Sequence, residues 1–154
     1  MQTERFSGLN VVVTGGRGGI GAAIVAAFTQ QGAAVVSADL SCRNDDPPPT
    51  AASQPVIERR LDVTDEASWT DLLDFVDARL GGLDILVNNA GIYVPNIAFE
   101  DMSLDIWRHH FAINSDGTFL GCKHAILRMR GRGGGAIVNM GSGMSITANP
   151  QGAA

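Results

Sequence analysis

Short apolar segments alternate along this chain with segments whose apolar residues recur at helical spacing. The apolar segments are residues 9–14, 33–38, 55–61, 83–87 and 136–140. Most of them are apolar along their whole length, which is typical of strands buried on both faces of a sheet. Parallel strands need long crossover connections, and these are usually helices. The alternation therefore predicts an α/β fold with a parallel sheet covered on both faces.

Three of the connections are predicted to be amphipathic helices. Their apolar positions are Ile20, Ile24, Ala27 and Phe28 in the first, Trp69, Leu72, Leu73, Val76 and Leu80 in the second, and Trp107, Phe111, Leu120 and Ile126 in the third. Thr64 or Asp65 caps the second helix, and Ser103 caps the third, which runs to about Met129. Right-handed crossovers then give a Rossmann-type doubly wound sheet of strand order 3-2-1-4-5, with a ligand crevice between the first and fourth strands.

The composition is that of one globular domain. Hydrophobic residues make up 45% and charged residues 18% of the chain, which is too apolar for a disordered protein. A length of 154 residues supports a single core, so we expect one domain over residues 1–154. Residues 41–55 contain three consecutive prolines and are predicted to form a surface loop.

Charge, cysteine spacing and hydropathy exclude several partners. A formal net charge of −5 leaves no basic patch for phosphates, so no nucleic acid is expected. No apolar run approaches the ~18 residues that cross a bilayer, so no membrane partner is expected either. Cys42 and Cys122 lack CxxC spacing and are typical of reduced thiols, which favours a cytoplasmic location. His109, His110 and His124 lack the spacing of metal ligands, so no metal site is expected.

The segment TGGRGGIG, residues 14–21, lies between a predicted strand and a predicted helix. Glycines there allow a tight turn and a close approach to a pyrophosphate, and the free N–H groups at the helix start favour its negative charge. A glycine-rich turn that only packs the helix on the strand remains the alternative at this point.

Asp39 follows Gly21 by 18 residues, at the carboxyl end of the second predicted strand. A carboxylate at that place can accept hydrogen bonds from both ribose hydroxyls of an adenosine. It also repels a 2′-phosphate, so NAD is predicted over NADP, although Arg17 in the loop partly offsets this repulsion.

The sequence resembles the short-chain dehydrogenases/reductases over essentially its whole length. The resemblance rests on TGGRGGIG, Asp39, Asp62-Val63, Asn88-Asn89-Ala90-Gly91, Asn114 and Ser142, each on the expected element and in the family's order. It implies that the cofactor is held by Gly15, Arg17, Gly18, Gly19, Ile20, Gly21, Asp39, Leu40, Asp62, Val63, Asn89, Ala90, Gly91 and Ile113.

The resemblance also implies hydride transfer between nicotinamide and an alcohol or ketone. In the family a tyrosine is the general acid/base, and a lysine four residues later lowers its pKa. Ser142 matches the serine that hydrogen-bonds the substrate oxygen, and Asn114 matches the asparagine that positions a water in the proton relay. Because Phe111 and Thr118 lie one turn on either side of Asn114, we expect its face of the helix to be buried.

The catalytic tyrosine and lysine of the family are absent from this sequence. The family's spacing places the tyrosine thirteen residues after the serine, one position beyond Ala154. Tyr93 is the only tyrosine and Lys123 the only lysine, and neither has the family's spacing. We therefore expect the amino-terminal, NAD-binding portion of a longer enzyme, truncated before the last two strands of the sheet and inactive alone.

Two other functions compete with this interpretation. A catalytically silent nucleotide-binding or interaction protein would also carry the glycine loop and Asp39. A methyltransferase using adenosylmethionine shares those two features, but Asn88-Asn89-Ala90-Gly91, Asn114 and Ser142 argue against it.

Association is expected on two grounds. The family forms dimers and tetramers, so the resemblance implies a homo-oligomer for the full-length product. In the chain itself, residues 136–140 are predicted to form an apolar edge strand with unpaired backbone groups, which favours self-association.

Overall fold

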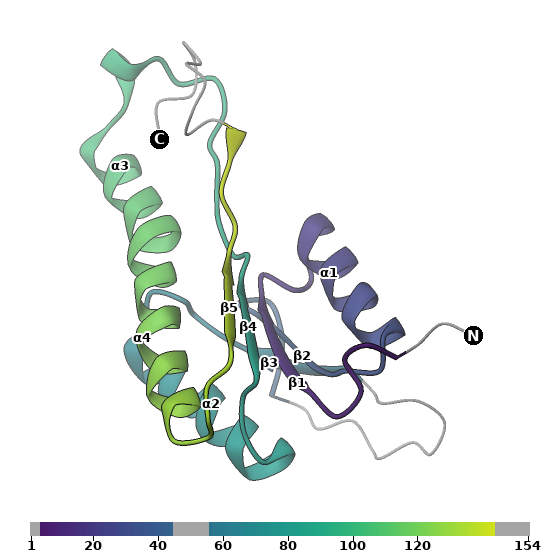
Figure 1. Cartoon of the computed structure of the whole chain (residues 1–154). Helices are drawn as coiled ribbons and strands as arrows, with labels where there is room; N and C mark the ends of the chain where they lie inside the picture. The colour runs from purple at the N-terminus through teal and green to yellow at the C-terminus, as the bar shows by residue number, and fades with distance from the viewer. Residues whose placement is uncertain (1–3, 45–55, 144–154) are drawn as a thin grey trace.

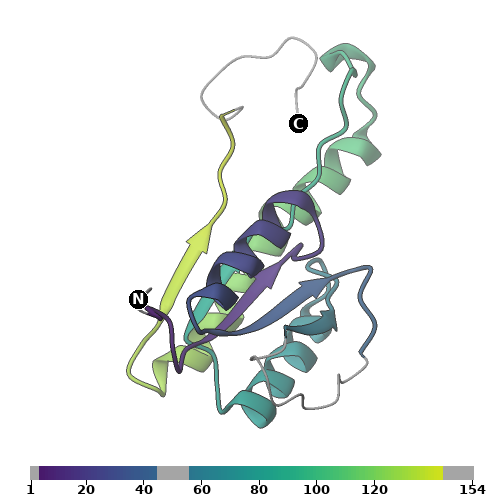
Figure 2. The ribbon, with the colours of Figure 1, turned by 90° about the vertical axis from the view of Figure 1, so that its right-hand side faces the viewer.

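Five parallel strands form one sheet in the order β3-β2-β1-β4-β5, which confirms the predicted order. The strands are β1 (Asn10–Thr14), β2 (Ala34–Asp39), β3 (Ile57–Arg60), β4 (Ile85–Asn88) and β5 (Ala136–Asn139). The computed structural model describes residues 4–44 and 56–143. In Figure 2 the arrows of β1 (purple), β2 (blue) and β5 (yellow) run in the same direction, so their carboxyl ends share one edge of the sheet.

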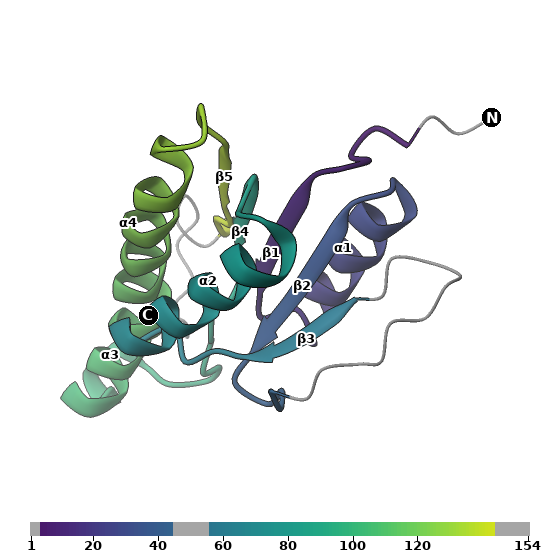
Figure 3. The ribbon, with the colours of Figure 1, turned by 90° about the horizontal axis from the view of Figure 1, so that it is seen from below.

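Helices cover both faces of this sheet. They are α1 (Gly19–Gln30), α2 (Glu66–Leu80), α3 (Leu104–Phe111) and α4 (Gly117–Arg130), with a 3-10 turn η1 (Phe99–Asp101) before α3 and a π-helical turn η2 (Ala112–Asp116) between α3 and α4. α3, η2 and α4 form one long rod (Figure 1). Figure 3 shows α1 on one side of the sheet and α2 and α4 on the other. None of the described helices has the length and apolar character needed to cross a membrane.

The valines of β1 face both sides of the sheet in turn. Val11 and Val13 pack in the layer under α1, and Val12 packs in the layer under α2 and α4. All three are fully buried. The run of β-branched residues is therefore explained by a central strand that has no solvated face.

The α2 helix begins and ends as the sequence predicts. The Asp65 carboxylate accepts a hydrogen bond from Ala67 N–H at 3.1 Å, which caps the first turn. Gly81 ends the helix in the left-handed conformation at φ 83°. Trp69, Leu72, Leu73 and Val76 are buried, and Leu80 is partly buried against the same core. Ser103 caps α3 through a hydrogen bond from Ile106 N–H at 3.2 Å.

Predicted strand boundaries differ from the structure by one or two residues, and the fourth strand and the third helix show the clearest differences. The fourth strand begins at Ile85 and not at Leu83, because the Asn10 side chain donates hydrogen bonds to Leu80 O and Gly82 O and holds that stretch as a turn. The long third helix is interrupted by η2, a turn that no residue pattern signals. The predicted loop 41–55 lies mostly outside the described residues.

Candidate functional site

The glycine loop after β1 lies against the carboxyl end of β2. Gly16 N–H donates a hydrogen bond to Ala38 O at 3.3 Å, and Gly15 has a positive φ of 63°. A Cβ on Gly21 would lie 2.1 Å from Gly15 O, so α1 packs on the loop only with glycine at that position. This close approach leaves the first turn of α1, with its free N–H groups, at the edge of the sheet.

Thr14 joins the glycine loop to the turn after β4. Its hydroxyl accepts hydrogen bonds from Asn89 N–H at 3.0 Å and Ala90 N–H at 2.9 Å, and donates to Val87 O at 3.5 Å. The Asn89 side chain donates to Thr14 O at 2.9 Å and to Gly15 O at 3.3 Å. One donor and two acceptors are all that a hydroxyl offers, so Thr14 is fully satisfied. The ends of β1 and β4 are therefore held together.

Asp39 is an ionised acceptor at the end of β2. Burial raises the pKa of its carboxyl group, but three hydrogen bonds and the nearby Arg17 charge outweigh burial and hold the pKa below its ordinary value. Ser41 supplies two of these bonds, from N–H at 3.0 Å and from Oγ at 2.7 Å, both to Oδ1. Arg17 N–H donates the third, to Oδ2 at 3.4 Å. The carboxylate is thus charged at neutral pH.

A cavity of about 220 Å³ lies between the glycine loop, Asp39 and the turn after β4. Eight of the residues predicted to hold a cofactor line it, namely Gly15, Asp39, Leu40, Asp62, Val63, Ala90, Gly91 and Ile113. Arg17, Gly18, Gly19, Ile20 and Gly21 follow Gly15 in the loop and first turn of α1, and Asn89 binds that loop from behind. Ala38, Leu61 and Ile92 also line the cavity, and sequence reasoning missed them because small or apolar residues at strand ends carry no chemical signal.

Asp62 lies on the β3 side of this cavity. Hydrogen bonds from the Thr64 hydroxyl at 2.7 Å and the Thr64 N–H at 3.0 Å lower the pKa of the Asp62 carboxyl. Its own N–H donates to Ser68 Oγ at 3.1 Å. The turn between β3 and α2 is therefore fixed by side chains, and it presents Asp62 and Val63 to the cavity.

Asn114 sits in η2 and binds the segment after Gly91. Its side chain accepts a hydrogen bond from Ile92 N–H at 2.9 Å and donates one to Ile92 O at 3.0 Å. The expected burial of Asn114 is wrong, because the side chain is exposed to solvent. Phe111, one turn before Asn114, is exposed as well, so this stretch of the rod has no buried face in the described residues on which the asparagine could lie.

Ser142 follows β5 at the same edge of the sheet. Met140 N–H donates to Asn88 O at 3.0 Å, which continues the ladder between β4 and β5 to within two residues of Ser142. The serine is exposed, like most of β5. Ser142 follows β5 and Asn114 binds the segment that follows β4, so both lie beyond the carboxyl ends of neighbouring strands.

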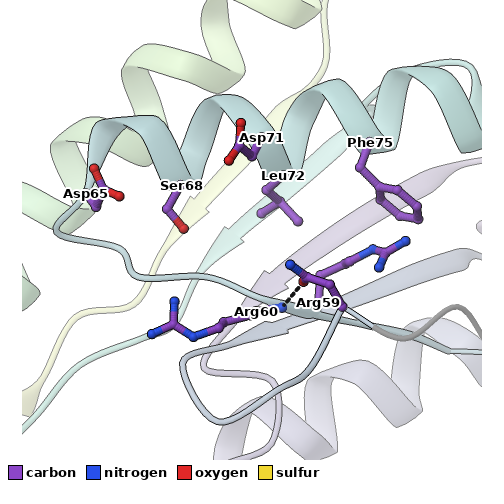
Figure 4. A pocket seen from close by; sticks show the side chains of 8 residues that line it. Arg59, Arg60, Asp65, Ser68, Asp71, Leu72 and Phe75 are labelled. Atoms are coloured by element: carbon purple, nitrogen blue, oxygen red, sulfur yellow. Dashed lines mark hydrogen bonds between the residues drawn. The ribbon is translucent and has the colours of Figure 1, made fainter.

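A second, larger cavity of about 380 Å³ lies between β3 and α2 and contains no residue of the glycine loop. Figure 4 shows its two guanidinium groups below α2. Arg59 is buried with its guanidinium 3.5 Å from the centre of the Phe75 ring, and Arg60 N–H donates to Asn44 Oδ1 at 3.0 Å. The Arg59 guanidinium thus has a structural partner in Phe75, and the smaller cavity, which Gly15 and Asp39 line, fits the predicted cofactor better.

Across the described stretches 4–44 and 56–143, no three His, Cys, Asp or Glu side chains form a group that could hold a metal ion. His124 instead contacts the Glu66 carboxylate at 3.0 Å, and His110 Nδ1–H donates to Ile106 O at 2.8 Å.

Comparisons with known proteins agree with this geometry. Residues 9–154 match the family described as short chain dehydrogenase. The chain is 40% identical over 141 residues to a cis-4-hydroxycyclohexanecarboxylate dehydrogenase from Sinomonas cyclohexanicum, covering 90% of this chain and 57% of that protein. It is 39% identical over 146 residues to an NADP-dependent (R)-specific alcohol dehydrogenase from Lentilactobacillus kefiri, covering 91% and 56%.

A solved structure shares the fold. A crystal structure of gox2181 superposes with a TM-score of 0.86 at 30% identity, covering 99% of this chain and 62% of that one. The chain thus spans little more than half the length of the curated relatives that it matches. The family match extends over nearly all of its residues, and this chain belongs to the short-chain dehydrogenase family.

Proposed function

We propose that this chain is the cofactor-binding portion of an NAD-dependent oxidoreductase that acts on an alcohol or ketone. The ionised Asp39 carboxylate, which lines a cavity of about 220 Å³ together with Gly15 of the glycine loop, is the observation that carries the proposal. Gly21 supports the fit of a dinucleotide, because a Cβ at this position would occupy the space in which Gly15 of the loop packs on α1. We infer a small-molecule substrate, no nucleic-acid partner, a cytoplasmic location and a homo-oligomeric whole protein.

Each part of the cavity suits one part of a dinucleotide. The loop N–H groups and the start of α1 favour the pyrophosphate, and Asp39 accepts from the ribose hydroxyls. Leu40, Val63 and Ile113 give apolar walls for the adenine, with Asp62 at its edge. Asn89 and Ala90 hold the loop from the β4 side, and Gly91 lines the cavity beside them. When bound, the nicotinamide supplies or accepts a hydride.

Two residues of this chain would serve the reacting end. Ser142 is proposed to hydrogen-bond the substrate oxygen, and Asn114 to position a water for proton transfer. The general acid/base and its lysine partner are proposed to lie outside this chain. Tyr93 is followed four positions later by Ile97, and Lys123 pairs with Glu66 at 2.5 Å on the flank of α4, so neither replaces them.

The preference for NAD rests on Asp39 and not on the family, since the relative from Lentilactobacillus kefiri is described as NADP-dependent. A carboxylate beside the ribose attracts its hydroxyls and repels a 2′-phosphate.

Asp39→Ala tests the proposal by isothermal titration with NAD and NADP. We expect NAD affinity to fall about tenfold or more, because a charge-assisted hydrogen bond contributes roughly 1.5–3 kcal/mol. NADP affinity should fall less or rise. Asp105→Ala removes an exposed carboxylate on α3 and should change neither. An unchanged ratio of the two affinities in Asp39→Ala would remove the basis for choosing NAD.

A further inference from the structure

Arg17 and Glu58 form an ion pair next to the proposed ribose site. Arg17 Nη1 lies 3.7 Å from Glu58 Oε2, and each side chain is 49% exposed. Arg17 belongs to the glycine loop and Glu58 to β3, so the pair bridges the loop to the edge strand across β2. Asp39, by contrast, contacts Arg17 only through the backbone N–H in the described residues.

The backbone dictates this bridge. A Cβ on Gly16 would lie 2.4 Å from Ser37 Oγ, so the loop runs directly over Ser37 of β2. Ser37 is the register partner of Glu58 in the parallel ladder between β2 and β3. Residues two apart on a strand face the same side, so Ser37, Asp39 and Glu58 share the side that Arg17 crosses.

The pKa of the buried Cys42 thiol is affected by the same three charged groups. Burial raises the pKa of Cys42, the negative charges of Glu58 and Asp39 raise it further, and Arg17 lowers it. Two carboxylates and one guanidinium therefore surround the same small region, which keeps a net negative charge.

We propose that Glu58 is a positioning residue for cofactor choice, because its pairing with Arg17 engages the only cation of the glycine loop, which is then not free to pair with a 2′-phosphate at the ribose edge beside Asp39. The site then rejects a 2′-phosphate more strongly than Asp39 alone would achieve. This inference rests on the proposed function, since it concerns the same dinucleotide site.

A double-mutant cycle on the full chain tests the inference, with binding of NAD and NADP measured by calorimetry and no turnover needed. In Glu58→Gln, NADP affinity should rise about threefold to tenfold, the size expected for one charge at a few ångströms in a solvated site, whereas NAD affinity changes less than about twofold. In an Arg17→Gln background the same substitution should give little gain, because the released cation is missing.

The controls distinguish a positioning effect of Glu58 from the effect of losing any surface charge and from an effect on folding. Glu100→Gln removes an exposed carboxylate on η1 and should leave the NAD-to-NADP ratio unchanged. A merely structural effect of Glu58→Gln would weaken both ligands together. An unchanged ratio in Glu58→Gln, or an equal gain with and without Arg17, overturns the inference. Failure of the unsubstituted chain to bind either dinucleotide would instead overturn the proposed function.

Discussion

Gly21 shows how a single missing atom shapes the nucleotide site. The space that its Cβ would need is taken by Gly15 O at 2.1 Å and Asn89 Nδ2 at 2.7 Å. Gly15 O is a backbone atom, and Asn89 Nδ2 is held in place by two hydrogen bonds. Neither atom can therefore move away easily. The loop and the turn after β4 therefore meet around this glycine.

Gly21→Ala should lower the free energy of unfolding by about 2 kcal/mol or more, because an overpacked backbone contact must be relieved by moving the loop. Urea unfolding followed by tryptophan fluorescence measures the change. Gly19→Ala, two residues earlier with open space around its Cβ, should change stability by less than about 1 kcal/mol. Equal stabilities for the two variants would contradict this account of the packing.

Charged and polar residues of the candidate site could be predicted from the sequence, whereas its apolar lining residues could not. Asp39 was predicted because an acid directly after a buried strand, 18 residues beyond the glycine motif, has few structural uses. Leu61 and Ile92 line the same cavity but resemble any apolar residue at a strand end. Asn114 was expected to be buried because Phe111 is apolar, but Phe111 is itself exposed, and the sequence carries no signal of that exposure.

At the scale of elements, ion pairs join α2 to α4 along one flank. Glu66 Oε1 contacts Lys123 Nζ at 2.5 Å and His124 Nε2 at 3.0 Å. Further along, Arg128 bridges Asp74 at 2.5 Å and Asp77 at 2.6 Å. The two helices cover the same face of the sheet, so these pairs fix how α4 lies beside α2.

This flank should make stability depend on acid. Hydrogen bonds from Lys123 and then His124 lower the pKa of Glu66. Its contribution is therefore present above the unfolded-state pKa of about 4.3 and is lost as pH falls through the lower folded-state pKa. In Glu66→Gln, which has nothing to protonate, the loss of unfolding free energy on acidification should be smaller than in the unsubstituted chain.

Chemical denaturation at a series of pH values measures this slope. Glu100→Gln serves as the charge-matched control on η1 and should keep the full acid dependence. If Glu66→Gln and Glu100→Gln lose stability in parallel with the unsubstituted chain, the contacts to Lys123 and His124 add nothing to the fold.

Element order and identity were predictable, whereas η2 was not. Strands that alternate with amphipathic helices permit few topologies, and the observed order is the right-handed one. A π-helical turn has no composition of its own, so residues 112–116 are indistinguishable in sequence from the helix around them. In the structure, this turn differs from the helix around it by the hydrogen bonds of the Asn114 side chain to the Ile92 backbone.

For the molecule as a whole, β5 is the more exposed of the two edge strands of the described sheet, the other being β3. It pairs only with β4 within that sheet, and Val138 is 47% exposed. Unpaired N–H and C=O groups on an apolar edge are a template for another strand.

The isolated chain should therefore self-associate at micromolar concentrations, as sedimentation velocity would show. Val138→Lys places a charge on the edge strand and should shift the distribution toward monomer. A monodisperse monomer for the unsubstituted chain would contradict the prediction.

The hydrogen bonds of Thr14 affect the entropy cost of binding a cofactor. Its single hydroxyl ties the turn after β4 to the end of β1, so two loops that flank the cavity move as one body. A ligand then meets a preorganised cradle, and the entropy of ordering both loops has already been lost in folding. The affinity of such a site depends on the stability of the domain, and a substitution at either strand end is expected to affect the other through the hydrogen bonds of Thr14 and Asn89.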